Sequence, residues 1–301
     1  MKEKHSFHNP IIYIIIPVYN GWQQTRICLN ALRESEYKNL EIIVVDHGST
    51  DETKASLPVE YPEVVHILGA SSLWWTGATN LGIRTAISRG AERIMLLNND
   101  CYITPKTIHI LVHHSKKAGE AIIAPVQRNY DTEDIICTTS RHFFLLGFQG
   151  VPSYSLATNK NCSATLIPTQ LIFGGRGVII ATNIFKRIGM FDEVNLPHYY
   201  ADHDFYLRCR KHSIPLYIAL DSIVYIDQRR TSIAALYQKM TFREFYQSLF
   251  NRRSHRNLRD LATLFKKHYP IKGFYFIGVF LNVTRYVFVY LWHRMTCRMF
   301  H

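Results

Sequence analysis

The sequence predicts an α/β fold in which a mixed sheet is flanked by helices, followed by a C-terminal helical segment rich in basic and aromatic residues. The first observation is the run IIYIIIPV at residues 11–18, which is rich in β-branched residues and too short for a fully apolar helix. The second is that strand, helix and strand patterns follow one another within about thirty-five residues, as in a βαβ unit. The third is that the excess of basic over acidic residues is confined to residues 228–301, which sets this segment apart from the rest of the chain.

The first hundred residues predict four strands and two helices. The run at residues 11–18 is the first strand, and apolar residues at helical spacing predict a helix at 25–34. Short apolar runs predict strands at 40–45, 64–68 and 94–97, and a helical pattern lies at 79–89.

Polar residues follow three of these strands directly, at 19–20, 46–51 and 98–100. In α/β sheets, ligands bind beyond the carboxyl ends of the strands. We therefore expect one crevice to gather all three clusters.

The middle of the chain is less regular. Residues 121–173 predict mixed strands and loops, and the glycine-rich turn at 174–177 leads into another strand. A short helix is expected to end at Gly189, which suits a C-cap. Residues 202–211 predict a helix with two acids, Asp202 and Asp204, in its first turn.

The basic excess lies in the last quarter of the chain. The formal charge is +12, and residues 228–301 hold 14 Lys and Arg against two acids, which leaves residues 1–227 neutral. With 47% hydrophobic residues the chain is neither disordered nor fibrous. We expect a catalytic domain at 1–227, and a partner attracted by charge is expected to meet the segment 228–301.

Six scattered cysteines form no CxxC pair, and no signal peptide pattern precedes them. This favours a reducing, cytoplasmic setting.

The last segment combines a basic helical stretch at 232–269 with an apolar, aromatic run at 273–292. Such a run is long enough to cross the ~30 Å core of a bilayer, but Arg285 and Asn282 lie inside it, and charge there is costly. A helix lying in the membrane interface is favoured over a spanning helix and over a soluble packing helix. Five basic residues are expected to meet anionic headgroups: Lys266, Lys267, Lys272, Arg294 and Arg298.

Three positions carry candidate chemistry, each with a plainer alternative. Asp100, just past a strand, could hold a divalent cation, or belong to an ordinary Asn-Asn-Asp turn. Asp202 and Asp204 could act on substrate, or Asp204 could cap the helix and pair with Arg208. Asp46 could bind a ligand, or its loop could cap a helix.

Six motifs in order resemble family 2 inverting glycosyltransferases of the GT-A fold, a Rossmann-like mixed sheet with flanking helices. They are PVYN, VVDHGSTD, TGATNLGI, LLNND, GMFDE and ADHDFYLR, and the resemblance covers roughly residues 10–227. It is strongest toward the bacterial rhamnosyl- and galactofuranosyl-type transferases that build surface polysaccharides such as O-antigen.

The resemblance implies a nucleotide-sugar site, with Asp46 recognising the base and Asp100 holding Mn or Mg on the diphosphate. The residues that it places in this site are Pro17, Tyr19, Asn20, Asp46, Gly77, Asn80, Asn98 and Asn99.

It also implies that Asp202 is the general base, with Asp204 as its catalytic neighbour. The reaction would be one in-line displacement at the anomeric carbon, with inversion. The residues expected around the sugar and acceptor are Trp75, Gly175, Arg176, His198 and Tyr199, and Trp74 offers a further stacking face.

Two departures stand out from the family pattern. Asn98 replaces the first acid of the D-x-D motif, and His47 replaces an acid after Asp46. The downstream metal ligand has no evident match, and Asp227 is the nearest candidate.

The expected function is transfer of a sugar from a dTDP- or UDP-sugar to a glycan or lipid-linked glycan, at the inner face of the cell membrane. One alternative is an inactive nucleotide-sugar-binding scaffold of an assembly complex. A nucleotidyltransferase is disfavoured because no glycine- and lysine-rich phosphate loop occurs near the N-terminus. Nucleic acid is not expected as a partner, because the aromatics of the tail are not interleaved with its basic residues.

Overall fold

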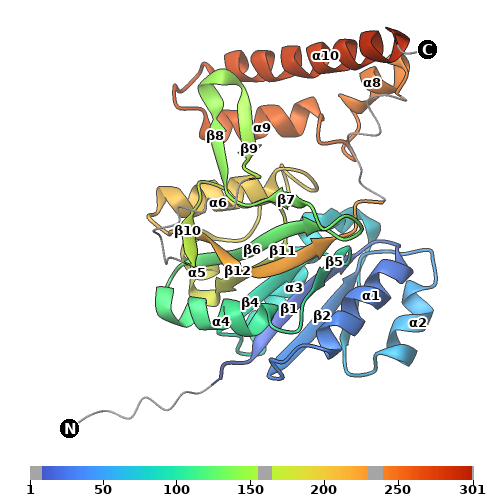
Figure 1. The fold of residues 1–301 in the computed structure, drawn as a ribbon, viewed down its shortest axis with the longest axis vertical. Helices are drawn as coiled ribbons and strands as arrows, with labels where there is room; N and C mark the ends of the chain where they lie inside the picture. Colours follow the sequence, from blue (N-terminus) through green and yellow to red (C-terminus); the bar gives the residue numbers. More distant parts are fainter. Residues whose placement is uncertain (1–8, 155–164, 230–239, 300–301) are drawn as a thin grey trace.

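The computed structural model describes residues 9–154, 165–229 and 240–299. Its centre is a ten-stranded sheet. Eight strands follow the order β10-β12-β6-β11-β4-β1-β2-β3, β5 pairs with β12, and β7 pairs with β6. Helices cover both faces of the sheet, and the C-terminal helices form a separate layer at one end of the molecule (Figure 1).

The N-terminal half follows the predicted βαβ pattern. Strands β1 (Ile12–Val18), β2 (Leu40–Asp46), β3 (Val65–Leu68) and β4 (Arg93–Leu97) are parallel neighbours. The predicted helices are α1 (Trp22–Arg33) and α3 (Trp74–Ser88). These elements confirm the sequence prediction to within a few residues.

Four elements of this half were not predicted. They are α2 (Thr53–Glu60), the short helix η1 (Ser71–Leu73), β5 (Cys101–Ile103) and α4 (Thr107–Ala118). Helix α2 has only eight residues and contains Pro58, and β5 has only three residues, so neither offers a periodic pattern long enough to recognise it.

Side chains of β1 alternate between two cores. Ile14 and Ile16 pack with α1, α2 and α4, whereas Tyr13 and Ile15 pack with α3, α5 and α6. Burial on both faces explains why this strand is continuously apolar.

The second half makes the sheet mixed. Strand β11 (Arg176–Ala181) runs antiparallel to both β4 and β6 (Ile122–Asn129), and the remaining strands of the sheet are β7 (Ile135–Cys137), β10 (Leu166–Pro168) and β12 (Leu216–Ile226). Helix α5 (Thr182–Ile188) ends at Gly189 with φ 84°, which confirms the predicted C-cap. Helix α6 (Ala201–Lys211) carries the two predicted acids in its first turn.

A hairpin joins the sheet to the C-terminal layer. Strands β8 (Ser140–Phe143) and β9 (Phe148–Pro152) are linked by the short helix η2 (Phe144–Leu146), and the hairpin extends from the sheet toward α9 and α10 (Figure 1). Phe144 packs edge-on against Phe265 of α9, with 5.1 Å between ring centroids.

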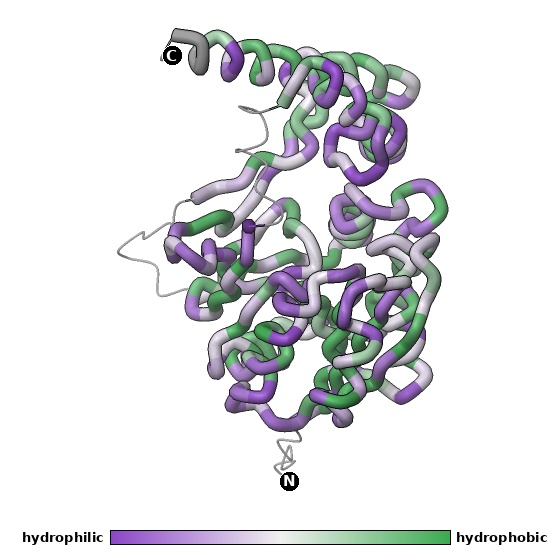
Figure 2. Tube along the Cα trace, turned by 90° about the vertical axis from the view of Figure 1, so that its right-hand side faces the viewer, coloured by the Kyte–Doolittle hydropathy of each residue, from purple (hydrophilic) through white to green (hydrophobic). Residues whose placement is uncertain are grey.

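The C-terminal layer contains α8 (Phe242–Ser248), α9 (Leu258–His268) and α10 (Tyr275–Met299). The basic stretch predicted as helical is thus α8 and α9 with a turn between them, and its part at 232–239 lies outside the described residues. Helix α10 is largely hydrophobic along its length (Figure 2). Its section Tyr275–Met295 is long and apolar enough to cross a membrane, and 22% of its most apolar window is buried.

Candidate active site

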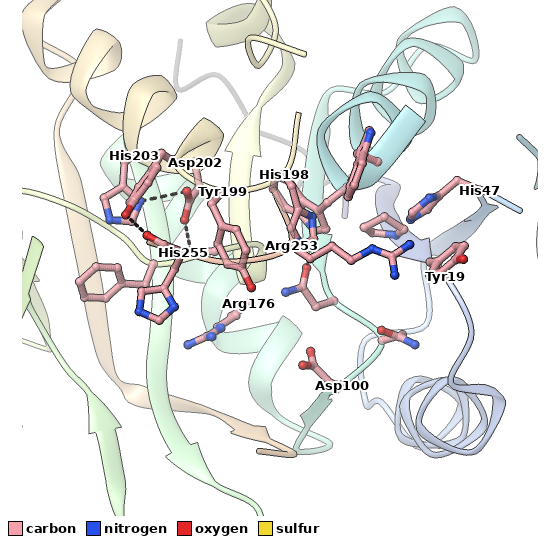
Figure 3. Close-up of a pocket in the computed structure, with 18 of the residues that line it drawn as sticks. Tyr19, His47, Asp100, Arg176, His198, Tyr199, Asp202, His203, Arg253 and His255 are labelled. Atoms are coloured by element: carbon pink, nitrogen blue, oxygen red, sulfur yellow. Dashed lines mark hydrogen bonds and ion pairs between the residues drawn. The ribbon is translucent and has the colours of Figure 1, made fainter. Parts of the chain in front are cut away.

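A cleft of about 950 Å³ opens at the carboxyl ends of β1, β2 and β4, where the sequence predicts it. Figure 3 shows Tyr19 and His47 toward one end of the cleft, Asp202 and His203 toward the other, and Asp100 and Arg176 between them. Eleven of the predicted site residues line it: Pro17, Tyr19, Asn20, Trp75, Asn98, Asn99, Asp100, Arg176, His198, Tyr199 and Asp202.

The loop after β1 is tied to the loop after β2. Asn20, with φ 56°, accepts a hydrogen bond on Oδ1 from the Thr50 N–H, and its own N–H donates to the Ser49 hydroxyl. Asp51 Oδ2 accepts from the N–H groups of Gly21 and Trp22 at the start of α1. These bonds fix the two loops against each other without any ligand.

Asp46 lies buried beneath this end of the cleft. Its Oδ1 accepts from the Ser49 N–H at 2.8 Å, whereas its Oδ2 is buried without a hydrogen-bond partner, 3.9 Å from Nε2 of His66. A buried carboxylate oxygen that lacks a donor is costly, so this atom suits a donor brought by a ligand.

Aromatic rings and one arginine surround the mouth of the same end. Tyr19 stacks on His47, with 5.4 Å between ring centroids. The Arg253 guanidinium, from the turn between α8 and α9, lies 5.9 Å from the rings of both Tyr19 and Trp74. Burial, with the nearby charges of His47 and Arg253, lowers the pKa of His198 to about 4, so this imidazole is neutral at pH 7.

The segment after β4 is held by neighbouring side chains. The Trp75 indole N–H donates to Asn98 Oδ1 at 2.9 Å, and the Asn98 N–H donates to the Gly175 carbonyl. A Cβ on Gly175 would lie 3.2 Å from the Trp75 ring, so this glycine permits the close packing that orients Asn98.

Asp100 and Asp227 form a pair of carboxylates in the floor of the cleft. Both line it, and the Asp227 N–H donates to the Asp100 carbonyl at 2.9 Å. Burial raises the pKa of Asp100, the charge of Arg176 opposes that rise and the charge of Asp227 adds to it. A buried carboxyl group whose pKa is raised, with a second carboxylate beside it, suits a divalent cation bound by oxygen.

No third His, Cys, Asp or Glu joins these two acids within residues 9–154, 165–229 and 240–299. Mg²⁺ commonly takes only one or two carboxylates from the protein and completes its shell with phosphate oxygens and water. The residues present therefore fit a cation bound together with a diphosphate.

Asp202 is held rigidly at the start of α6. Its Oδ1 lies 2.9 Å from Nδ1 of His203, and its Oδ2 accepts from the Gly174 N–H at 2.6 Å. Burial acts to raise the pKa of Asp202, but His203 and these hydrogen bonds outweigh it, so the pKa lies below its usual value. The carboxylate is thus ionised, oriented and able to accept a proton.

Elements from far along the chain close this end of the cleft. The Tyr200 hydroxyl donates to the carbonyl of His255, and a Cβ on Gly150 would lie 3.2 Å from Nε2 of His203. Burial, with a contribution from Arg256, lowers the pKa of His255 to about 4. The C-terminal segment and the β8–β9 hairpin therefore both form walls beside Asp202.

Five predicted site residues do not line the cleft: Asp46, Gly77, Asn80, Gly175 and Asp204. Asp204 is fully buried, with its carboxylate 2.7 Å from Lys267, 2.9 Å from His268 and 2.9 Å from Arg208. It joins α6 to α9, and this geometry corresponds to the structural alternative of pairing with Arg208.

Asn80 has a similar supporting position. Its side chain donates to the Phe191 carbonyl and accepts from the Phe191 N–H. Gly77 packs on Leu73 and lies near Glu193. These two residues join α3 to the GMFDE motif behind the cleft.

Several lining residues were absent from the predicted site, chiefly Gln149, Gly150, Phe173, His203, Arg253 and His255. His203 stands inside a predicted motif and could have been found there. The others come from segments whose local sequence carries no site pattern, so only the tertiary structure brings them in.

Comparison with known proteins agrees with this geometry. A family model described as Glycosyl transferase family 2 matches residues 13–188, more than half of the chain. An uncharacterised glycosyltransferase of Rickettsia typhi is 24% identical over 286 residues, which is 90% of this chain and 85% of the relative. The dTDP-rhamnosyl transferase RfbF of Shigella flexneri is 26% identical over 216 residues, 71% of this chain and 68% of the relative.

The fold also matches a solved structure. The mannosyltransferase PcManGT of Pyrobaculum calidifontis, in complex with GDP-Man and Mn²⁺, superposes with a TM-score of 0.59 at 15% identity, over 97% of this chain and 74% of that one. The sequence prediction of the family and of its fold is thereby confirmed. The chain belongs to glycosyl transferase family 2 and is a transferase with the GT-A fold.

Proposed function

We propose that the protein is an inverting glycosyltransferase that moves a sugar from a nucleoside-diphosphate donor to a membrane-linked glycan acceptor in cell-surface polysaccharide synthesis. The observation that carries this proposal is one cleft that contains an oriented, ionised Asp202 and the carboxylate pair Asp100 and Asp227. A base and a cation site in one cleft are what a single displacement at an anomeric carbon requires.

Asp202 acts as the general base. As the acceptor hydroxyl attacks the anomeric carbon, its proton passes to the Asp202 carboxylate and a new glycosidic bond forms. The bond from the anomeric carbon to the diphosphate oxygen breaks, and its electron pair leaves with the nucleoside diphosphate. His203 and the Gly174 N–H hold the carboxylate in place during this step.

Asp100 and Asp227 would hold the divalent cation, Mn or Mg. When bound, that cation neutralises charge on the diphosphate leaving group. Asn98 and Asn99 border the same floor of the cleft, and Arg176 balances the charge of Asp100.

The opposite end of the cleft binds the nucleotide. Tyr19 and His47 offer a stacked aromatic face, and Asp46 Oδ2, buried beneath this end without a hydrogen-bond partner, would accept from an N–H of a pyrimidine base that displaces the loop above it. Arg253 lies over this mouth and would contact the diphosphate. A dTDP-sugar or UDP-sugar fits these features, and the relative from Shigella flexneri is named for a dTDP-sugar.

Helix α10 supports attachment to a membrane surface. Its exposed stripe contains no charged residue, and its members at positions of helical spacing are Ile277, Phe280, Leu281, Thr284, Val287, Phe288, Leu291, Trp292 and Met295. An uncharged stripe of this length on the outside of a helix offers an apolar face to a lipid interface.

Asn282 and Arg285, which interrupt the apolar run, contact the protein. The Asn282 side chain donates to the Gly147 carbonyl at 2.6 Å, and the Arg285 guanidinium lies 4.1 Å from the Phe148 ring. Tyr290 stacks on Phe245 of α8, with 4.5 Å between ring centroids. Because α10 is packed lengthwise on its neighbours, it favours lying in the interface over crossing the bilayer.

We therefore assign catalysis chiefly to residues 1–227 and membrane association chiefly to residues 228–301, of which Arg253 and His255 also line the cleft. The enzyme would be peripheral on the inner face of the cell membrane. The proposed acceptor is a lipid-linked glycan, because the protein itself would be held at a lipid surface.

Calorimetric titration with UDP-, dTDP- and GDP-sugars, with and without Mn²⁺, tests the proposal. Wild type should bind one donor in a metal-dependent way, and Asp202→Asn should bind it equally well while losing transfer. A donor affinity that is the same with and without Mn²⁺, or wild-type transfer activity in Asp202→Asn, would contradict the mechanism.

A further inference from the structure

Three exposed apolar side chains lie at the turn of the β8–β9 hairpin, which belongs to the catalytic part of the chain. Phe143, Leu145 and Leu146 are 44%, 50% and 63% exposed. Phe144, between them, is buried against α9. Because the buried ring fixes the turn, its three neighbours are held outward in a defined orientation.

This turn lies directly against α10. A Cβ on Gly147 would lie 2.7 Å from the Asn282 backbone nitrogen and 2.9 Å from Cβ of Leu281, and the turn stands at the level of α10 in Figure 1. Leu281 is a member of the exposed stripe of α10. The apolar side chains of the turn therefore extend that stripe onto the catalytic domain.

The charge around this surface selects its partner. Neither of the two elements that form this surface carries an acid, because no Asp or Glu occurs in the hairpin at 140–152 and none occurs after Asp260. Arg141 on β8 and Lys272 before α10 are exposed. A second copy of the chain would bring an equally basic face, whereas anionic headgroups are complementary to it.

We propose that the β8–β9 turn is a second lipid-contacting element, and that it forms with the stripe of α10 one surface that docks on a bilayer with anionic headgroups. This inference rests on the proposed function, in which α10 lies at the membrane and the acceptor is lipid-linked.

The base of the same hairpin reaches the cleft. Gln149 lines the cleft, accepts from the Asn282 side chain at 2.5 Å and donates to the Tyr286 hydroxyl at 3.3 Å. The next residue, Gly150, packs against His203, the partner of Asp202. A single hairpin thus runs from the lipid surface to the wall beside the general base, which gives an acceptor anchored in the bilayer a path to Asp202.

Co-sedimentation of the full-length protein with phosphatidylcholine vesicles, with and without phosphatidylglycerol, tests the surface. The double variant Leu145→Ser/Leu146→Ser should bind anionic vesicles about tenfold more weakly than wild type, because two large apolar side chains lose their burial in lipid. The matched control Val59→Ser/Val194→Ser changes residues that are 77% and 78% exposed elsewhere in the catalytic domain, and it should bind as wild type does.

Wild-type vesicle binding by the hairpin variant would overturn the proposal and leave α10 as the lipid contact. A dimer that the hairpin variant dissociates, without any vesicle binding by wild type, would overturn it in favour of a second copy. If the double variant has a lowered thermal midpoint, Leu146→Ser alone carries the test, with a loss of about threefold.

Donor binding by calorimetry separates this inference from the proposed function. It should be equal in wild type and both double variants. If the wild-type protein binds vesicles through the hairpin but binds no nucleotide sugar, the proposed function is contradicted and the inference about the lipid surface is supported.

Discussion

The two ends of the cleft are built in different ways. The nucleotide end comes mainly from the loops that follow β1, β2 and β4, all within the first hundred residues. The end beside Asp202 is assembled from the hairpin, the glycine-rich turn, the start of α6 and the turn before α9. One end is a local product of a βαβ pattern, and the other depends on long-range packing.

This difference has a physical consequence. The nucleotide end is anchored by the backbone ladder of parallel strands and by loop bonds such as that from Thr50 to Asn20. The other end is anchored by single side chains, including Tyr200 on the His255 carbonyl and Gln149 on Tyr286. Substitutions far from the cleft should therefore weaken acceptor binding and transfer more than they weaken donor binding.

The largest expected effect separates chemistry from binding. Asp202→Asn should lower kcat by about 10²–10⁴, the usual contribution of a general base, with donor affinity unchanged. Steady-state transfer assays and donor calorimetry measure the two quantities. If kcat and donor affinity fell by similar factors, Asp202 would support the fold of the cleft and would not act on the acceptor.

The next largest effect on activity is expected from substitutions of the carboxylates in the floor of the cleft. Asp100→Asn and Asp227→Asn should each lower kcat/KM by about a hundredfold, because a cation there contributes several kcal/mol, and raised Mn²⁺ should partly restore activity. Asp131→Asn, at an exposed carboxylate outside the cleft, is the control. An Asp227→Asn enzyme with wild-type Mn²⁺ dependence would remove Asp227 from the cation site.

Asp204→Asn should act on stability and not on the chemical step. The substitution leaves His268 and Lys267 without their buried partner, and breaking such a pair costs about 3 kcal/mol. Urea denaturation measures the loss, and the residual folded enzyme should bind donor normally. If Asp204→Asn had wild-type stability but no transfer activity, Asp204 would be a catalytic residue.

The smallest effect on catalysis probes a contact between the C-terminal segment and the nucleotide end. Arg253→Ala should raise the donor KM by about tenfold, as expected for the loss of one charge-assisted contact, with kcat little changed. Arg243→Ala, on the exposed face of α8, is the matched control. A fall in kcat alone would place Arg253 with the acceptor.

Acid should weaken the packing at both ends of the cleft, because His198 lies at the nucleotide end and His255 lies beside Asp202. His198 and His255 have pKa values lowered to about 4, from an ordinary 6.5, so the unfolded chain binds their protons first. Their contribution to stability is complete above pH 6.5 and is lost as the pH falls toward 4. Urea unfolding at pH 7 and pH 5 should show this loss, and a smaller loss is expected in His255→Gln.

The sequence by itself determined the parallel half of the sheet, the crevice at its carboxyl ends and the family. Apolar runs, glycine positions and polar clusters are local properties, and six ordered motifs sufficed to predict that Tyr19, Asn98, Asp100 and Asp202 share one cleft. These residues lie in or directly beside the elements whose periodicity identifies them.

Only the tertiary structure decided the rest. It paired Asp227 with Asp100 across 127 residues of chain, brought Arg253 and His255 to the cleft, and turned Asn282 and Arg285 of α10 inward. It also showed Asp204 to be an ionic link between α6 and α9. Contacts between distant segments depend on how whole elements pack, and no local spacing in the chain encodes that packing.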